Sequence, residues 1–151
     1  MNLRLENNGD ILLSKYPALG KRYKLLDRLQ GKGIGTSKLH YKNGVTVFDE
    51  LQQLNQDTAF VNFEPTKAGF ILHFNKTNRV RAFGIPFQQI ENVVIKQTQA
   101  QPKPQIFRLT SGNILIKTTS NLIKINIPAG KIKKVILFFE TYLMQNQLVI
   151  L

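Results

Sequence analysis

The sequence predicts a mainly β fold, a small antiparallel barrel or sandwich of about seven strands closed by a C-terminal α-helix. Two observations predict it. Residues 58 to 127 form short segments of alternating polar and apolar residues, each ending at a turn signal, and residues 128 to 147 repeat apolar residues at helical spacing. Short, evenly spaced strands pair with their chain neighbours in antiparallel fashion. We expect such a fold to bind a partner rather than to catalyse a reaction.

An N-terminal helix and a β-hairpin are expected to precede the barrel. Residues 16–30 place Leu19, Tyr23 and Leu26 on one helical face and basic residues on the other, which predicts a basic amphipathic helix. The glycines at positions 31, 33 and 35 end this helix. Residues 38–48 flank Asn43-Gly44, a type I′ turn signal, and therefore predict a hairpin. Asp49 is then expected to cap a short helical turn that ends near Asn55.

The regular part of the chain begins at Thr58. Four strands are expected first, separated by short polar turns, and three more follow the loop at residues 98–104. The seven expected strands are Thr58 to Phe63, Gly69 to Phe74, Val80 to Pro86, Asn92 to Gln97, Gln105 to Thr110, Asn113 to Lys117 and Asn121 to Ile127. Because no linker interrupts the pattern, we expect residues 58–151 to form one domain, with residues 1–57 packed on it as an extension.

The end of the chain is apolar to an unusual degree. Residues 128–147 predict a helix whose core face includes Ile132, Val135 and Phe139. Beyond that face the chain offers further apolar side chains, at Phe138 and in the tail residues Leu148, Val149 and Ile150. One interpretation is that helix and tail pack on the chain's own N-terminal helix. The other is a homo-oligomer contact, formed by strand addition to an exposed sheet edge.

The order of four strands, three strands and a C-terminal helix is that of the pleckstrin-homology superfold. Three segments in particular, Gly69 to Phe74, Asn75 to Asn78 and Ile85 to Val93, resemble the bacterial PH-like and GRAM-like domains, in which a strand, a polar turn and a strand precede an I-P-x-x-x-I step. The resemblance covers residues 58 to 146 and concerns the structural pattern. It implies a PH-like fold and an interaction module.

The phosphoinositide site of eukaryotic PH domains is not implied by the resemblance. In those domains the first hairpin bears a lysine near the end of one strand and a basic-x-Arg pair on the next. The corresponding segment here, Glu64 to Gly69, has one lysine, one acid and an apolar second strand, while Arg79 and Arg81 lie one hairpin later.

No pattern in the sequence points to catalysis, to a metal or to a cofactor. The nine acidic residues are mostly isolated in sequence, and the strand alternation points both His40 and His73 away from the core. The segment Gly31 to Lys38 resembles a P-loop but has Thr36 where the second glycine is required. We interpret it as a flexible connection, with a backbone nest for an anion as the alternative.

The net charge of +12, from 21 basic and 9 acidic residues, lies in two blocks and favours anionic partners. Strand alternation aligns basic side chains on one sheet face, and the following helix is expected to continue this column. The candidate surface residues are Arg108, Lys117, Lys124, Lys131, Lys133 and Lys134, with Lys21, Lys24 and Arg28 in the first block.

These charges also have a plainer interpretation, because a basic run is often only a solvated face that keeps a protein soluble. The leading hypothesis is a non-catalytic module that binds a protein or peptide partner or an acidic membrane surface. The alternative is non-specific binding of nucleic acid, and a small enzyme is the least favoured hypothesis.

Overall fold

The computed structural model describes residues 1–54, 58–77, 79–98 and 111–151. In this part of the chain nine strands form one sheet in the order β1-β5-β4-β3-β2-β8-β7-β6-β9. All neighbours pair antiparallel except β6 and β9, which are parallel. The strands are β1 (Asn2–Leu3), β2 (Leu39–Asn43), β3 (Phe60–Pro65), β4 (Gly69–Lys76), β5 (Arg79–Pro86), β6 (Ile90–Thr98), β7 (Ser111–Thr118), β8 (Leu122–Ile127) and β9 (Leu148–Ile150).

The mainly β class is confirmed, but the predicted closure into a barrel is wrong. β1 and β9 stand at opposite ends of the strand order, so the sheet is open. It is mixed because β6 and β9 pair in parallel. The α-helices are α1 (Leu25–Leu29), α2 (Thr46–Gln53) and α3 (Ile132–Tyr142). Single 3₁₀ turns occupy η1 (Leu13–Lys15), η2 (Pro17–Leu19), η3 (Phe87–Gln89) and η4 (Gln145–Gln147).

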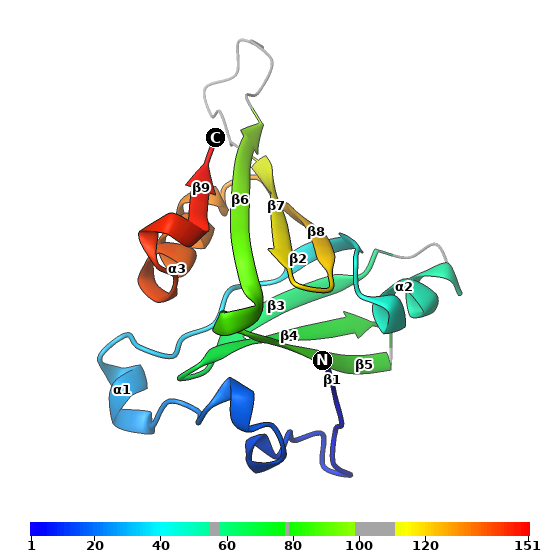
Figure 1. Cartoon of the computed structure of the whole chain (residues 1–151). Coiled ribbons are helices and arrows are strands. Elements are labelled where there is room, and N and C mark those ends of the chain that lie inside the picture. The colour runs from blue at the N-terminus through cyan, green and yellow to red at the C-terminus, as the bar shows by residue number, and fades with distance from the viewer. Residues whose placement is uncertain (55–57, 78, 99–110) are drawn as a thin grey trace.

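The core lies where the two halves of the sheet and α3 meet. Figure 1 shows β3, β4 and β5 running across β6, β7 and β8, with α3 beside the second group. Phe139 of α3 is fully buried, and its ring lies 5.3 Å from that of Phe63 and 5.6 Å from that of Phe70, both edge-on. Burying three aromatic side chains together is a large hydrophobic contribution to stability. The helix therefore supports the sheet from its inner face.

Six of the seven expected strands are confirmed, with small changes at their ends. They correspond to β3, β4, β5, β6, β7 and β8. Burial alternates as predicted in β3, β7 and β8, whereas β4 and β5 contain runs that are buried on both faces. The seventh, Gln105 to Thr110, lies outside the described residues. The C-terminal helix is also confirmed but is shorter than residues 128–147, because Leu143 already has extended backbone.

The predicted amphipathic helix over residues 16–30 is wrong. Its first part is the single turn η2, which ends at Gly20 with φ +68°, and its last part is the five-residue α1. Between them the backbone hydrogen-bonds to a distant turn, since Ala68 donates to the carbonyl of Leu19 and Lys67 to that of Lys21. These carbonyls are then unavailable to a continuous helix.

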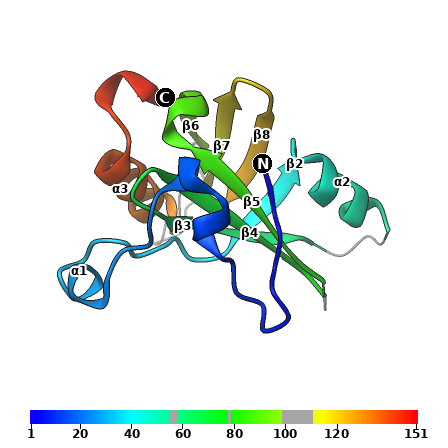
Figure 2. The same ribbon diagram turned by 60° about the horizontal axis from the view of Figure 1, so that its bottom comes forward.

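Leu19 is nevertheless buried, as its apolar character predicts. It packs with Leu3, Ile11, Ile71 and Ala82 in a second, smaller core on the outer face of the sheet. Figure 2 shows the N-terminal segment crossing in front of β4 and β5 to form it. The start of the chain thus covers the half of the sheet face that the main core leaves open.

The predicted hairpin over residues 38–48 is also wrong, because Asn43-Gly44 leads from β2 into α2 rather than into a second strand. Asp49 lies in the first turn of α2 instead of capping it. Its carboxylate accepts hydrogen bonds from the Tyr41 hydroxyl at 2.6 Å and from the Gly44 amide at 3.2 Å. β2 pairs instead with β3 and β8, in the middle of the sheet.

Gly44 is the position where a single methyl group is expected to disturb the fold most. Its φ is +116°, and a Cβ there would collide with the Leu122 carbonyl. We expect Gly44→Ala to lower the free energy of unfolding by about 3 kcal/mol in urea titration. Gly9→Ala is the matched control, since Gly9 has φ +82° with open space around it, and about 1 kcal/mol is expected. Equal losses would contradict the close approach of β2 and β8.

The C-terminal tail adds a strand to the chain's own sheet. Leu151 donates to the carbonyl of Ile95 at 2.9 Å, and Gln97 donates to that of Leu151 at 3.2 Å. The predicted packing of the tail on an N-terminal helix is therefore wrong. Phe138 is only 8% exposed and belongs to the main core, so it cannot be an oligomer contact, whereas Val149 and Ile150 remain exposed at the sheet edge.

Candidate functional site

Three leucines of α1 face solvent, although the sequence pattern placed Leu26 on a buried face. Leu25, Leu26 and Leu29, which we call the α1 leucine cluster, are 73%, 72% and 75% exposed. Figures 1 and 2 show α1 projecting away from the body of the sheet. Ile34, on the segment that follows, is 55% exposed. Exposed large apolar side chains gathered on a projecting element indicate a contact surface.

α1 is short, yet its position is held by several contacts. Asp27 accepts a hydrogen bond from the Lys24 amide at 3.0 Å. Lys67 reaches α1 from the turn between β3 and β4, where its ammonium lies 3.8 Å from Asp27 and 4.3 Å from the centre of the Tyr23 ring. The Tyr23 ring in turn contacts Tyr142 of α3 edge-on, with the centroids 6.1 Å apart. The cluster is therefore presented by an anchored element.

Two glycines of the glycine-rich segment after α1 lie in close contact with neighbouring residues. Gly33 has φ +75°, and a Cβ there would collide with Tyr23, while a Cβ on Gly35 would collide with the Phe63 carbonyl. The Gly33 amide donates to the Tyr142 hydroxyl at 2.8 Å, and the Thr36 amide to the Phe63 carbonyl at 2.9 Å. Because these two amides are engaged, the segment has fewer donors for the anion nest that was the alternative interpretation.

Basic residues lie on α1 or close to it in sequence. Four exposed cations of the first basic block lie on α1 or within a few residues of it, namely Lys21, Lys24, Arg28 and Lys32. Lys67 adds a fifth from the β3–β4 turn. The one acid on α1, Asp27, is occupied by Lys67 and by its backbone hydrogen bond. The tip of the molecule at α1 is thus both apolar and positively charged.

An open cavity of about 720 Å³ lies at the base of α1, between the glycine-rich segment and the outer face of β3 and β4. We call it the Arg28 cavity. Its charged lining residues are Asp10, Arg22, Arg28 and Glu64, with His73 beside them. Its volume is within the usual range of small-ligand sites.

A three-residue polar network forms the floor of the Arg28 cavity. Glu64 accepts from Arg22 Nε at 2.9 Å through one carboxylate oxygen, and the other lies 2.7 Å from His73 Nε2. Arg22 also donates to the carbonyl of Ile11 at 3.3 Å. Burial alone would raise the pKa of Glu64, but the hydrogen bond to His73 and the Arg22 charge outweigh it and hold the pKa below its usual value of 4.5.

Replacing Glu64 tests this network. Glu64→Gln removes the charge that Arg22 and His73 contact, so we expect the free energy of unfolding at pH 7 to fall by about 2 kcal/mol. Because the pKa is lower in the folded state, the stabilisation is present above about pH 4.5 and is lost as the pH falls through the folded-state pKa. Urea titrations at both ends of this range measure the difference.

Glu91→Gln is the matched control for Glu64→Gln. Glu91 forms an ion pair with Lys117 at 2.7 Å, but both side chains are well exposed, so a change below about 0.5 kcal/mol is expected. A Glu64→Gln variant as stable as this control, or a loss that does not shrink in acid, would mean that the network contributes nothing to folding.

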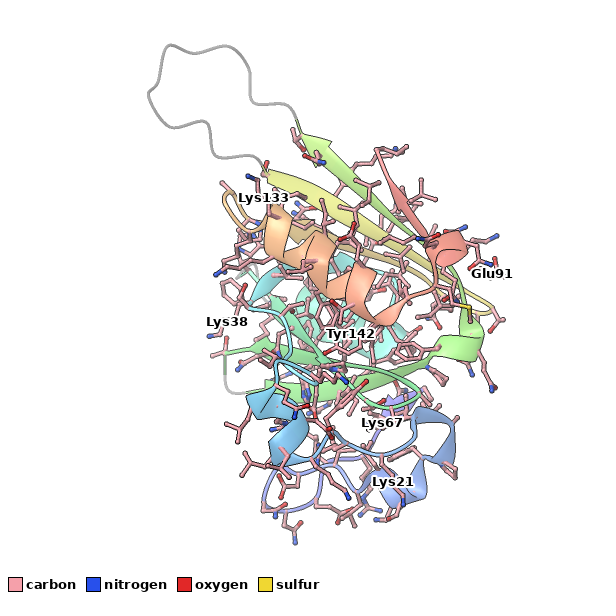
Figure 3. The ribbon with its side chains drawn as sticks, turned by 90° about the vertical axis from the view of Figure 1, so that its left-hand side faces the viewer. Lys21, Lys38, Lys67, Glu91, Lys133 and Tyr142 are labelled. Carbon is pink, nitrogen blue, oxygen red and sulfur yellow. The ribbon has the colours of Figure 1, made fainter. Side chains whose placement is uncertain are left out.

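The basic residues of the second block do not form the expected continuous column. Lys117 and Lys124 project from the outer face of β7 and β8, whereas α3 packs on the inner face. Lys131, Lys133 and Lys134 therefore lie on another side of the molecule, where Lys131 donates to the carbonyl of Lys38 at 3.1 Å. Figure 3 shows Lys133 at the opposite end of the molecule from Lys21 and Lys67. Arg108 lies outside the described residues.

A second cluster of cations lies on the outer face of the sheet. Lys42, Lys96 and Lys124 line a groove of about 460 Å³ together with amide side chains at Asn113 and Asn126. No acidic residue of the described chain lines it. Lys42 and Lys96 were not singled out in the sequence, although both lie on strands.

The Arg28 cavity was missed as a site. The alternation of β3 and β4 places Glu64 and His73 on the same outward face, and neighbouring strands bring them together, so this pair could have been found. No periodic signal could have brought Arg22 to Glu64, because Arg22 lies in irregular backbone and reaches the sheet only in the folded structure.

The described residues include no group of three His, Asp or Glu side chains that could hold a metal ion. Among the helices of this part of the chain, none has the length and apolar character needed to cross a bilayer. No protein-family model matches the sequence, and no curated protein matches it.

Proposed function

We propose that the protein is a non-catalytic module that docks on acidic membrane surfaces through α1. The observation that carries this proposal is the α1 leucine cluster, three leucines about three-quarters exposed on a helix that has four exposed basic residues on it or close to it in sequence. Apolar side chains that enter the interface, flanked by lysine and arginine that contact anionic headgroups, are the two components of peripheral membrane binding.

Burial of the leucines and attraction of the cations are expected to make contributions of similar size to the free energy of membrane binding. Leaving a leucine in water rather than burying it costs about 1.5 to 3 kcal/mol, so even partial insertion of the cluster is favourable. Each lysine or arginine near an anionic surface contributes about 1 kcal/mol at physiological salt. A protein partner could also cover the leucines, but the exposed cations on α1 and next to it in sequence favour an anionic surface.

We also propose that the fold is PH-like, as the sequence resemblance implies. Support comes from the division of the sheet into a four-strand group, β2 to β5, a three-strand group, β6 to β8, and the following α3. In this arrangement the four-strand group starts at β2, one strand earlier than the sequence pattern indicated. Residues 39–43, which were assigned to the extension, then belong to the main sheet.

We favour binding over catalysis because the carboxylates of the Arg28 cavity are unsuited to acid–base chemistry. Both oxygens of Glu64 are engaged, one by Arg22 and the other by His73. Asp10 is then the one lining carboxylate of the described chain that retains a free oxygen. A pair of carboxylates sharing a reaction needs two available groups.

Vesicle sedimentation tests the proposed function. The protein is expected to pellet with vesicles that contain phosphatidylglycerol, to remain in the supernatant with phosphatidylcholine alone, and to be released in part by high salt. Incomplete release is expected because the leucine contribution does not depend on salt. Failure to pellet with anionic vesicles at low salt would overturn the proposal.

Nucleic-acid binding is the second candidate, and the groove lined by Lys42, Lys96 and Lys124 is the observation that favours it. Phosphate contacts dominate non-specific affinity and make it steeply salt-dependent. If this surface is used, Lys96→Glu with Lys124→Glu abolishes binding to a generic oligonucleotide and leaves sedimentation with vesicles unchanged. Equal oligonucleotide affinity of variant and parent would remove this candidate.

A further inference from the structure

The Arg28 cavity contains hydrogen-bonding groups that the fold itself does not use. Arg28 contacts no partner among the described residues, so all of its N–H donors face solvent or the cavity. Arg22 uses Nε and Nη1 within the network and retains Nη2. Asn62 contributes a side-chain amide, also without a partner in the described chain. The cavity thus has more unsatisfied donors than acceptors.

The charges of the cavity are mixed rather than simply positive. Glu64 is balanced by Arg22 and hydrogen-bonded to His73, which leaves Arg28 and Asp10 as the two unbalanced charges, of opposite sign. Asp10 accepts one hydrogen bond from Asn8 through Oδ2 and keeps its other oxygen. A purely anionic ligand would be attracted by Arg28 and repelled by Asp10, whereas a ligand with both charges satisfies both residues.

We propose that the Arg28 cavity binds a phosphate ester that carries an amine, with the phosphate on Arg28 and Arg22 and the amine on Asp10. Guanidinium groups match phosphate oxygens in bidentate geometry, and a phosphate offers acceptors for several donors at once. This assignment extends the proposed function, because the cavity opens beside exposed apolar residues that would lie at the level of lipid headgroups.

The position of Ile34 links the cavity to the membrane surface. Ile34 lines the cavity and is more than half exposed, and Arg28 lies between two leucines of the α1 leucine cluster on the same helix. Insertion of the cluster would bring the mouth of the cavity to the phosphate layer of the bilayer. The same chemistry is also present in soluble phosphate esters, so the source of the ligand has to be distinguished by experiment.

Titration of the whole protein with O-phosphoethanolamine tests the ligand class, with glycerol 3-phosphate as the comparison compound that has a phosphate but no amine. Amide chemical-shift changes measure both affinities. We expect O-phosphoethanolamine to bind about tenfold more tightly, the difference made by one charged contact. Absence of binding, or equal affinity for the two esters, would overturn the proposal.

Variants of Arg28 and Asp10 are expected to change the affinities for the two esters in different ways. Arg28→Gln should weaken both esters about tenfold. Asp10→Asn should weaken O-phosphoethanolamine and strengthen glycerol 3-phosphate, so that the preference disappears. Lys133→Gln, which removes an exposed cation that does not line the cavity, should leave both affinities unchanged. Tighter binding of O-phosphoethanolamine by Asp10→Asn would show that the cavity is a plain anion site and would overturn the proposal.

Vesicles distinguish a lipid headgroup from a free ester. At a constant fraction of phosphatidylglycerol, replacing phosphatidylcholine by phosphatidylethanolamine should tighten binding severalfold, and Asp10→Asn should remove that gain. Binding of the soluble ester without this gain would assign the cavity to free esters alone and reject the lipid source. If the soluble titration succeeds while no anionic vesicle binds, the proposed membrane function fails and the ligand class stands.

Discussion

Replacing Leu25, Leu26 and Leu29 together by glutamine is expected to weaken binding to anionic vesicles about a hundredfold. Each leucine that enters the interface contributes about 1 kcal/mol when its burial is partial, and three of them about 3 kcal/mol. Glutamine retains helix propensity close to that of leucine. Since the three side chains are largely exposed, they contribute little to the core, and thermal unfolding should not change.

Leu137→Gln is the matched control for this triple variant. Leu137 lies on α3 and is 63% exposed, so it is a similarly exposed apolar side chain on another helix. Its replacement should leave sedimentation with vesicles unchanged. If the triple variant bound vesicles as tightly as the parent, or if Leu137→Gln weakened binding equally, α1 would not be the part that contacts the bilayer.

Neutralising three cations near α1 should have an effect of similar size, but one that depends on salt. Lys21, Lys24 and Lys32 are exposed, and about 1 kcal/mol of attraction to an anionic surface is expected for each. We expect the triple glutamine variant to bind about a hundredfold more weakly at low salt and to show a flatter salt dependence than the parent. Arg28 is left intact so that the cavity keeps its ligand-binding charge.

The basic residues at the start of α3 provide the comparison for this charge variant. Lys133 and Lys134 are also exposed, and Figure 3 shows Lys133 near the opposite end of the molecule from Lys21. Neutralising them should change vesicle affinity by no more than the general loss of net charge produces. An equal loss from both sets would indicate unspecific attraction of a protein of charge +12 rather than an oriented surface.

The sheet could be predicted because its signal is local. Alternation in β7 and β8 places Ile114, Ile116, Ile123 and Ile125 in the core, and each of these residues is buried as its position in the pattern requires. A strand pattern of period two is informative within a few residues. The buried face of α3 could be predicted in the same way, from apolar residues at helical spacing.

The N-terminal region could not be predicted in this way, because contacts that are distant in sequence determine it. Leu19 has the spacing of a helix face, but its carbonyl accepts a hydrogen bond from Ala68 and its side chain packs on Ile71. Leu26 belongs to the same pattern and faces solvent. Tertiary contacts outweigh helix propensity in segments as short as these. The exposed leucines were therefore visible only in the folded chain.

The pairing partner of the C-terminal tail could not be predicted from the sequence either. The apolar end at Leu148 to Ile150 suggested strand addition between copies of the chain, whereas the structure pairs it with β6 of the same chain. Sequence patterns indicate that a segment is suited to a strand and leave its partner open. The unexpected parallel pairing with β6 leaves β9 as the edge of the sheet.

The insertion of α1 into the membrane can be measured most directly with an environment-sensitive fluorophore on a single cysteine, because the chain contains none. A label at Leu26→Cys is expected to shift its emission to the blue with phosphatidylglycerol vesicles and not with phosphatidylcholine. A label at Leu122→Cys, on the outer face of β8 and 47% exposed, should not shift. No shift at position 26, or equal shifts at both positions, would contradict membrane docking through α1.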